Sequence, residues 1–347
     1  MSRTRTKVIA VGAVAAAVVS APTLAFAGSP GHDPKYDKYD GKYEKHDASY
    51  DKYADKYAAK VGYTVRVTYR DDPRSARNAV RDAKVGRLQV IGLVGDNTLV
   101  RFLSDKPGRT QKLGMVTGLE HKDVKLVGID YRVQNGLLYG VGRGGGVYTI
   151  DTVSLKATKV LNLTVALEGD TFGVDFNPAA NALRITSNTG QNLRQSFAMV
   201  APATTFAATA VDGRLNTPVV PTATATATAT ATVGVDAVAY TNNDLDADTG
   251  TVLKTINFSS DSLNLQSPAN AGTQALIGAL KVDAGSDNGF DIFSYLEDGA
   301  AVEVKGYATL AVGGQRGFYK INLTNGRATL VGRLGDAVTD IAIPLAR

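Results

Sequence analysis

The sequence repeats one short apolar segment five times, as GIDY (128–131), GVDF (173–176), GVDA (234–237), GFDI (289–292) and VTDI (338–341). Each segment has an aspartate in its third position, and successive aspartates are 45 to 61 residues apart. A recurrence with such a period is the signature of a repeat architecture. The repeated residues are Asp130, Asp175, Asp236, Asp291 and Asp340, with a glycine two positions earlier at Gly128, Gly173, Gly234 and Gly289.

Each segment opens a unit that reads as four short antiparallel strands. A second strand follows, for example LLYGVG (137–142), and a hairpin completes the unit. The hairpins GVYTIDTVSLKATKV (146–160) and GFYKINLTNGRATLV (317–331) match at six positions, and residues 97–114 are a fainter copy. Four antiparallel strands in this length are typical of a propeller blade. We therefore predict an all-β propeller with five blades, and the irregular stretch 200–233 leaves a sixth blade as the alternative.

The two ends of the repeat region predict how the ring closes. The stretch RLQVIGLVGDNTLVRF (87–102) reads as part of a blade but lacks its own opening segment. The last segment (338–345) has the opening strand but no blade after it. We expect the C-terminal strand to complete the first blade, because this pairing removes the open edges of the ring.

The repeated aspartates allow two interpretations. In an opening strand, Gly128 and Asp130 share one face, and a small residue suits a crowded position near a central axis. In the structural interpretation, each carboxylate accepts hydrogen bonds from backbone N–H groups and locks one blade to the next. Repetition in every unit favours this role, since a catalytic residue is needed only once. In the alternative, several carboxylates converge on the axis and hold a cation.

The region before the repeats divides into three segments. Residues 1–27 have a charged start, an apolar run from Val8 to Val19 and the small-x-small sequence Ala25-Phe26-Ala27, which predict a secretory signal peptide cut after Ala27. Residues 28–60 are a Tyr/Lys/Asp-rich low-complexity arm. Its tyrosines follow a heptad-like spacing, but it lacks aliphatic residues, so we expect disorder rather than a helix that docks on a partner. Residues 61–86 are transitional, and the propeller domain occupies 87–347.

Charge and cysteine content limit the function classes. The formal net charge of +5 includes three cations of the signal segment, which holds no acid, so the mature chain carries only +2. Nucleic-acid binding therefore gains little support. The chain has no cysteine, which suits a bacterial exported protein that relies on a large core rather than on disulfides.

Several motifs together resemble a known family. They are GDNTLVRF (95–102), GIDYRVQNGLLYGVG (128–142), GVDFNPAANALRITSNTGQNLR (173–194), YTNND (240–244), LQSPANAGT (265–273) and TDIAIP (339–344). These stretches are similar to the secreted bacterial family known as domain of unknown function 4394, over residues 87–345. The resemblance implies a propeller-like fold and no assigned activity.

Catalytic motifs are scarce. A Ser-His-Asp site is disfavoured because no GxSxG occurs and His121 is the only histidine of the repeat region. Five-bladed propellers include glycosidases that work with paired acids. Against a glycosidase, the repeat region has only four glutamates and the chain has no tryptophan to stack on a sugar ring.

Three loops are the remaining candidates. Asp244, Asp246 and Asp248 alternate in DLDADTG and could hold Ca²⁺, although Thr255 stands where an EF-hand has glutamate, and a plain Asx turn is the other interpretation. GRGGG (142–146) does not fit a nucleotide fingerprint, since no helix follows it. SNTGQNLR (187–194) is a hairpin turn whose polar side chains, with Arg184, could meet a ligand at a propeller face.

These observations favour an extracellular binding or interaction protein with a propeller as its platform. The rival hypothesis is a glycoside hydrolase or another carboxylate-based enzyme. We expect no catalytic residues and no cofactor, with Ca²⁺ as the one candidate ion. The expected partner is extracellular or in the cell wall, without nucleic acid and without membrane contact after signal cleavage. The expected location is outside the cell, free or loosely attached to the wall.

Overall fold

A computed structural model describes residues 87–345, apart from 198, 201–204, 219–228 and 247, together with the short strands β1 (Lys7–Ile9), β2 (Val65–Val67) and β13 (Met199–Val200). The chain forms two compact units. One comprises Met1–Ala76 and Ala198–Thr205, and within it β1 pairs with β2. The other comprises Arg77–Phe197 and Phe206–Arg347 and holds the repeats. Apart from β1 and β2, the signal, arm and transitional segments that the sequence predicts lie outside the described residues.

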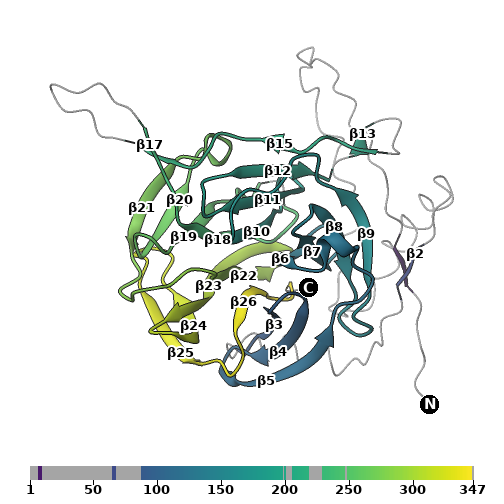
Figure 1. Cartoon of the computed structure of the whole chain (residues 1–347), viewed down its shortest axis with the longest axis horizontal. Helices are drawn as coiled ribbons and strands as arrows, with labels where there is room; N and C mark the ends of the chain where they lie inside the picture. The colour runs from purple at the N-terminus through teal and green to yellow at the C-terminus, as the bar shows by residue number, and fades with distance from the viewer. Residues whose placement is uncertain are drawn as a thin grey trace, which may run out of the picture. The chain divides into compact units, whose positions relative to one another are not determined.

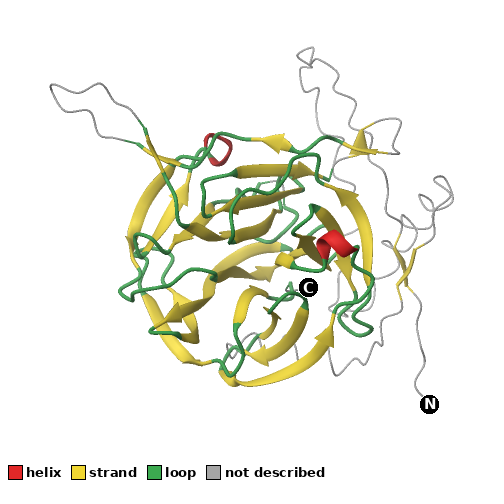
Figure 2. Ribbon diagram, in the orientation of Figure 1, coloured by secondary structure: helices red, strands yellow, loops and turns green. Residues whose placement is uncertain are grey.

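The second unit is a ring of five four-stranded antiparallel sheets, as Figures 1 and 2 show. This confirms the predicted five-bladed propeller. From the inner to the outer strand, the first blade contains β26 (Val338–Ala342), β3 (Gln89–Val94), β4 (Thr98–Leu103) and β5 (Lys106–Met115), and the second blade contains β6 (Leu126–Arg132), β7 (Leu137–Gly142), β8 (Gly146–Ile150) and β9 (Ala157–Asn162). The third blade contains β10 (Phe172–Asn177), β11 (Ala182–Ser187), β12 (Asn192–Ser196) and β15 (Ala210–Val211), and the fourth contains β18 (Val235–Tyr240), β19 (Leu253–Asn257), β20 (Ser262–Gln266) and β21 (Gln274–Ala279). The fifth blade contains β22 (Gly289–Glu297), β23 (Ala300–Val312), β24 (Gln315–Ile321) and β25 (Ala328–Arg333).

The remaining described elements are short. Strand β14 (Thr205–Phe206) pairs with β13, and β16 (Asn216–Thr217) pairs with β17 (Thr230–Ala231). Two 3-10 helices, η2 (His121–Asp123) and η3 (Ala269–Ala271), lie in connections. Within the described residues, the irregular stretch between the third and fourth blades contributes only such two-stranded pieces and the outer strand β15, so it builds no sixth blade.

The C-terminal strand closes the ring, as predicted. Strand β26 pairs antiparallel with β3, with Ile341 opposite Gly92 and Ala342 opposite Ile91. Figure 1 shows the yellow end of the chain beside the blue first blade. The first blade therefore joins residues almost 250 positions apart, as in the bond from Thr339 Oγ1 to the Leu93 carbonyl (|i−j| = 246).

The blades are held together by apolar layers between neighbouring sheets. The layer between the fifth and first blades contains Phe102 and Phe318, whose rings meet edge to face at 5.1 Å. The layer between the second and third blades contains Tyr139 and Phe176 at 5.0 Å. Strands supply these side chains because alternate residues point to opposite faces of each sheet. The ring is stable only when every sheet has a neighbour on both faces.

Glycines in the opening strands permit the close approach of neighbouring inner strands. A Cβ added to Gly173 would lie 2.8 Å from the backbone nitrogen of Val238, and one added to Gly289 would lie 2.6 Å from the Cα of Asp340. Backbone atoms cannot yield as a flexible side chain does. At Gly173 and Gly289 the spacing between blades therefore requires glycine.

We expect the substitution Gly173→Val to destabilise the propeller by about 3 kcal/mol or more, because a new side chain must push two inner strands apart. Gly250→Ala is the matched control, since nothing lies within 4 Å of the Cβ that it adds. Urea unfolding of both variants measures the effect. If Gly173→Val unfolds at the same midpoint as Gly250→Ala, the close approach is not required.

Candidate functional site

The five repeated aspartates bridge all five junctions between blades. Each lies in an inner strand, is at most 7% exposed and accepts a hydrogen bond from a backbone N–H group in the inner strand of the next blade or in the residues that flank that strand. The acceptor–donor pairs are Asp340–Ile129 (2.7 Å), Asp130–Phe176 (2.7 Å), Asp175–Tyr240 (3.0 Å), Asp236–Asp287 (2.6 Å) and Asp291–Ile343 (2.6 Å). This arrangement is the one expected of the structural role, in which a carboxylate locks one blade to the next.

The five aspartates hold the same place in the sequence motif but not the same place in the fold. Asp130 accepts the N–H of Phe176, the residue after Asp175. Asp291 accepts the N–H of Ile343, the residue after Ala342, and Asp175 accepts the N–H of Tyr240, the residue after Ala239. Ala239 and Ala342 therefore occupy, in the fourth and first blades, the position that an aspartate holds in the other three. Asp236 and Asp340 lie two or three residues earlier in their strands.

The shift coincides with irregular pairing. The ladder of β18 skips between Val235 and Ala237, and that of β26 skips between Val338 and Asp340. The ladder of β6 skips as well, between Leu126 and Gly128, although Asp130 holds the axial position. In all three strands the skipped residue lies three positions before the axial one, so what differs is where the motif stands relative to the β-bulge. The Gly-φ-Asp motif is preserved in the sequence while its aspartate is displaced in the fold.

Asp130, Asp175 and Asp291 converge near the axis. Each offers a carboxylate oxygen, and these atoms all lie within 4.8 Å of one another. Burial raises the pKa of all three side chains, to about 7 for Asp291, and the charge of Asp291 raises the pKa of Asp130 further. Such a cluster is neutralised either by bound protons or by a cation, and carboxylate oxygens suit a hard cation such as Ca²⁺. The structural and cation interpretations thus meet in the same three residues.

The other predicted metal ligands form a different structure. Asp244 accepts hydrogen bonds from the N–H groups of Asp246 (3.0 Å) and Ala301 (2.8 Å), and Asp246 accepts one from Asp248 (2.9 Å). These are successive Asx turns, in which the carboxylates bind the backbone rather than facing a common point. Among the described residues, only the axial aspartates form a group of three acids close enough to share an ion. Calcium binding by the Asp244 loop stays a prediction.

The glycine-rich loop GRGGG surrounds a buried aspartate that the sequence analysis missed. Asp123 is fully buried and accepts hydrogen bonds from the Tyr148 hydroxyl (2.7 Å) and the Gly146 N–H (3.1 Å). A Cβ on Gly142, Gly144 or Gly146 would lie within 2.8 Å of Asp123 atoms. Burial and this bond raise the pKa of Tyr148 to about 12. The loop is therefore glycine-rich because it packs on a carboxylate. His121, two residues earlier, is exposed.

The hypothesis that Arg184 meets a ligand at a propeller face is wrong. Arg184 is 2% exposed and pairs with the carboxylate of Asp212 at 2.7 Å. It also donates to Asn192 and Asn270, at 2.8 Å each. Asn192 in turn donates to the carbonyls of Gly213 and Ala269. These polar side chains tie the irregular loops of the third and fourth blades together inside the protein.

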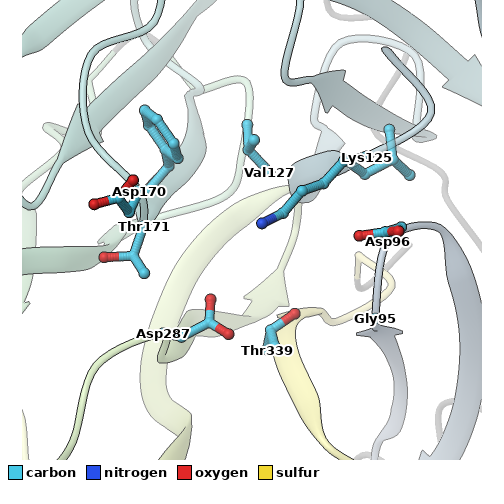
Figure 3. A pocket seen from close by; sticks show the side chains of 10 residues that line it. Gly95, Asp96, Lys125, Val127, Asp170, Thr171, Asp287 and Thr339 are labelled. Carbon is cyan, nitrogen blue, oxygen red and sulfur yellow. The ribbon is translucent and has the colours of Figure 1, made fainter. Parts of the chain in front are cut away.

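A cavity of about 190 Å³ lies at one end of the inner strands, where they begin (Figure 3). We call it the mouth cavity. Four of the five blades contribute to it, and none of its charged side chains was singled out from the sequence. Its lining is Gly95, Asp96, Lys125, Leu126, Val127, Asp170, Thr171, Phe172, Asp287 and Thr339.

Asp287 is the most constrained residue of the mouth cavity. Its φ of 71° lies in the left-handed region, which Asp and Asn adopt more readily than most other residues with a side chain. Its N–H donates to the buried carboxylate of Asp236 at 2.6 Å, while Arg316 donates to its carbonyl and lies 3.5 Å from its carboxylate. Its side chain is nevertheless 50% exposed. The surroundings thus hold the Asp287 backbone through both its N–H and its carbonyl, while its carboxylate borders the cavity.

Lys125 brings a positive charge to the same cavity, and Figure 3 shows its amine directed into the middle of the space, away from Asp96 and toward the side with Asp170, Thr171 and Asp287. Its backbone is fixed on both sides. The Lys125 carbonyl accepts the Arg143 N–H at 2.8 Å, and the N–H of the next residue, Leu126, donates to the backbone carbonyl of Asp96 at 2.7 Å. Burial raises the pKa of Asp287, and the charges of Arg316 and Lys125 oppose that rise. Within the described residues, no ion pair joins Lys125 to any acid of the cavity.

The comparison with family models agrees with the geometry. The model of the family described as Domain of unknown function (DUF4394) matches residues 98–342, from the second strand of the first blade to the closing strand. The chain belongs to this family. The match covers all five opening segments, so the propeller of this DUF4394 member is what its family model detects. No helix in the described ranges has the length and apolar content that a membrane span needs.

Other comparisons add little. No curated protein matches the chain. Among solved structures, it is similar to an auxiliary nutrient binding protein from Bacteroides ovatus ATCC 8483, with 14% identity and a TM-score of 0.36. The match covers 56% of this DUF4394 chain and 45% of that protein. A likeness this weak carries no information about function.

Proposed function

We propose that this DUF4394 protein is an extracellular binding protein, with the propeller as a rigid platform and the mouth cavity as its ligand site. The observation that carries the proposal is Asp287, whose half-exposed carboxylate borders the cavity while its backbone is held by hydrogen bonds with Asp236 and Arg316. The cavity volume of about 190 Å³ equals that of about six water molecules in the liquid and suits a small ligand.

The arrangement of the axial carboxylates disfavours the rival glycosidase. Glycoside hydrolysis needs two carboxyl groups that flank a bond of the sugar. Asp130, Asp175 and Asp291 are at most 7% exposed and use oxygens to bind backbone N–H groups. A polysaccharide has no access to them without opening the ring.

A thermal-shift screen of small metabolites against the parent and a blocked variant tests the proposal. Asp96→Trp fills the cavity from an exposed position, and Glu297→Trp adds the same side chain at the far end of β22. We expect some small molecules to raise the melting temperature of the parent and of Glu297→Trp but not of Asp96→Trp. The proposal fails if no compound has this pattern.

A parallel screen with chromogenic glycosides and polysaccharides, with and without Ca²⁺, addresses the rival function. We expect no turnover. Turnover that is lost on Asp→Asn substitution in one opening strand, and retained in the other four, would establish the enzyme instead.

A further inference from the structure

We propose that the mouth cavity recognises a small zwitterion, a molecule that carries both a carboxylate and an ammonium group, such as a free amino acid. This inference rests on the proposed function and names the ligand class of the same site.

The first argument is the pair of opposite charges that border one cavity without neutralising each other. Lys125 and Asp287 both line the space and influence each other electrostatically, yet among the described ion pairs Asp287 contacts only Arg316. Both have backbones fixed by hydrogen bonds to neighbouring elements. A ligand with one charge of each sign can pair with both side chains at once, since its carboxylate binds the Lys125 amine and its ammonium binds the Asp287 carboxylate.

The second argument concerns the acids on the other walls. Asp96 and Asp170 add two carboxylates, so the four charged side chains sum to −2. This surplus favours the ammonium end of the ligand and disfavours a simple anion. A simple inorganic cation is disfavoured in turn, because Lys125 projects into the same space.

The third argument is the uncharged part of the lining. Thr339 contributes a hydroxyl to the lining, 3.4 Å from the Leu93 carbonyl. It is a polar group that can bind either end of a zwitterion, because a hydroxyl both donates and accepts hydrogen bonds. Phe172, the only aromatic residue of the lining, is 5% exposed, so the cavity lacks an open ring surface on which a sugar would stack.

Isothermal titration calorimetry of the full-length protein with matched small molecules tests the inference. Glycine, β-alanine and γ-aminobutyrate vary the distance between the two charges, while ethylammonium and propionate each carry one charge. We expect at least one zwitterion of the series to bind at least tenfold more tightly than either singly charged compound. Glycerol and CaCl₂ should show no binding to the mouth cavity.

Two variants test the roles of the charged residues. Lys125→Met removes the positive charge, and Asp287→Asn removes the negative charge while keeping a residue type that tolerates positive φ. Each should weaken zwitterion binding at least tenfold. The controls Lys320→Met and Asp283→Asn change exposed charges outside the cavity and should bind as the parent does.

The outcomes separate the two proposals. If no zwitterion binds, or if both cavity variants bind zwitterions as tightly as the parent, the inference is overturned. If the metabolite screen then finds an uncharged or singly charged compound that Asp96→Trp excludes, the proposed function stands with a different ligand class. If nothing binds the cavity at all, both fail.

Discussion

Removal of residues 337–347 will abolish cooperative unfolding of the propeller. The deletion takes away β26, the inner strand of the first blade. It also removes two hydrogen bonds between blades, which the Ile129 N–H donates to Asp340 and the Ile343 N–H donates to Asp291. It also exposes the inner edge of β3 and opens the ring between the fifth and second blades. A propeller buries each sheet only between two neighbours, so one gap exposes two apolar faces.

Calorimetry or urea unfolding followed by circular dichroism measures this effect. The matched control is deletion of residues 345–347 alone, which leaves β26 and the Ile343 N–H in place. The control should unfold as the parent does. A deletion of 337–347 that still unfolds in one sharp transition near the parent midpoint would show that the ring does not depend on its closing strand.

The stability of the propeller will fall as the pH rises from about 5 to about 8. Burial raises the pKa of Asp236 and of Asp291 from 3.8 to about 7, and that of Asp130, Asp175 and Asp340 in the same direction. The folded state therefore binds more protons than the unfolded state at a pH between the unfolded and the folded pKa values, so the free energy of unfolding decreases as the pH rises through this window. We expect the melting temperature to drop by on the order of 10 °C across this range.

Asp291→Asn isolates the contribution of the axial cluster. The amide keeps an oxygen that can accept the Ile343 N–H but is neutral at every pH, so this variant should be less dependent on pH and more stable than the parent at pH 8. Asp291→Ala loses the acceptor and should be less stable at pH 5, by about 1–3 kcal/mol. Asp298→Asn, an exposed change on the hairpin between β22 and β23, is the control and should follow the parent.

The same melts, repeated with Ca²⁺ and with a chelator, decide between protons and a cation at the axis. If protons neutralise the cluster, neither addition changes the parent. A parent that the chelator strongly destabilises, together with an Asp291→Asn variant that melts like the chelated parent, would make the axis a metal site. Asp130→Asn and Asp175→Asn should then behave in the same way, because both belong to the converging group.

The sequence by itself determined the propeller fold, the order of strands within each blade and closure by the C-terminal strand, and it favoured five blades over six. Strand alternation, turn residues and an opening segment repeated five times are local signals, and repetition makes each copy evidence for the others. The glycine two residues before four of the five aspartates also predicted the crowded approach that Gly173 and Gly289 make to the next inner strand.

Only the tertiary structure decided which residues meet. In β18 and β26 the motif stands earlier relative to the β-bulge than it does in β6, so Ala239 and Ala342 hold the axial position instead of Asp236 and Asp340, and the linear motif carries no sign of this shift. The mouth cavity joins Lys125 to Asp287, which are 162 positions apart and belong to no common motif. Such a site depends on the register and curvature of four separate sheets, whereas the repeat depends on the pattern within each sheet, and this is why the sequence reveals the ring but not its site.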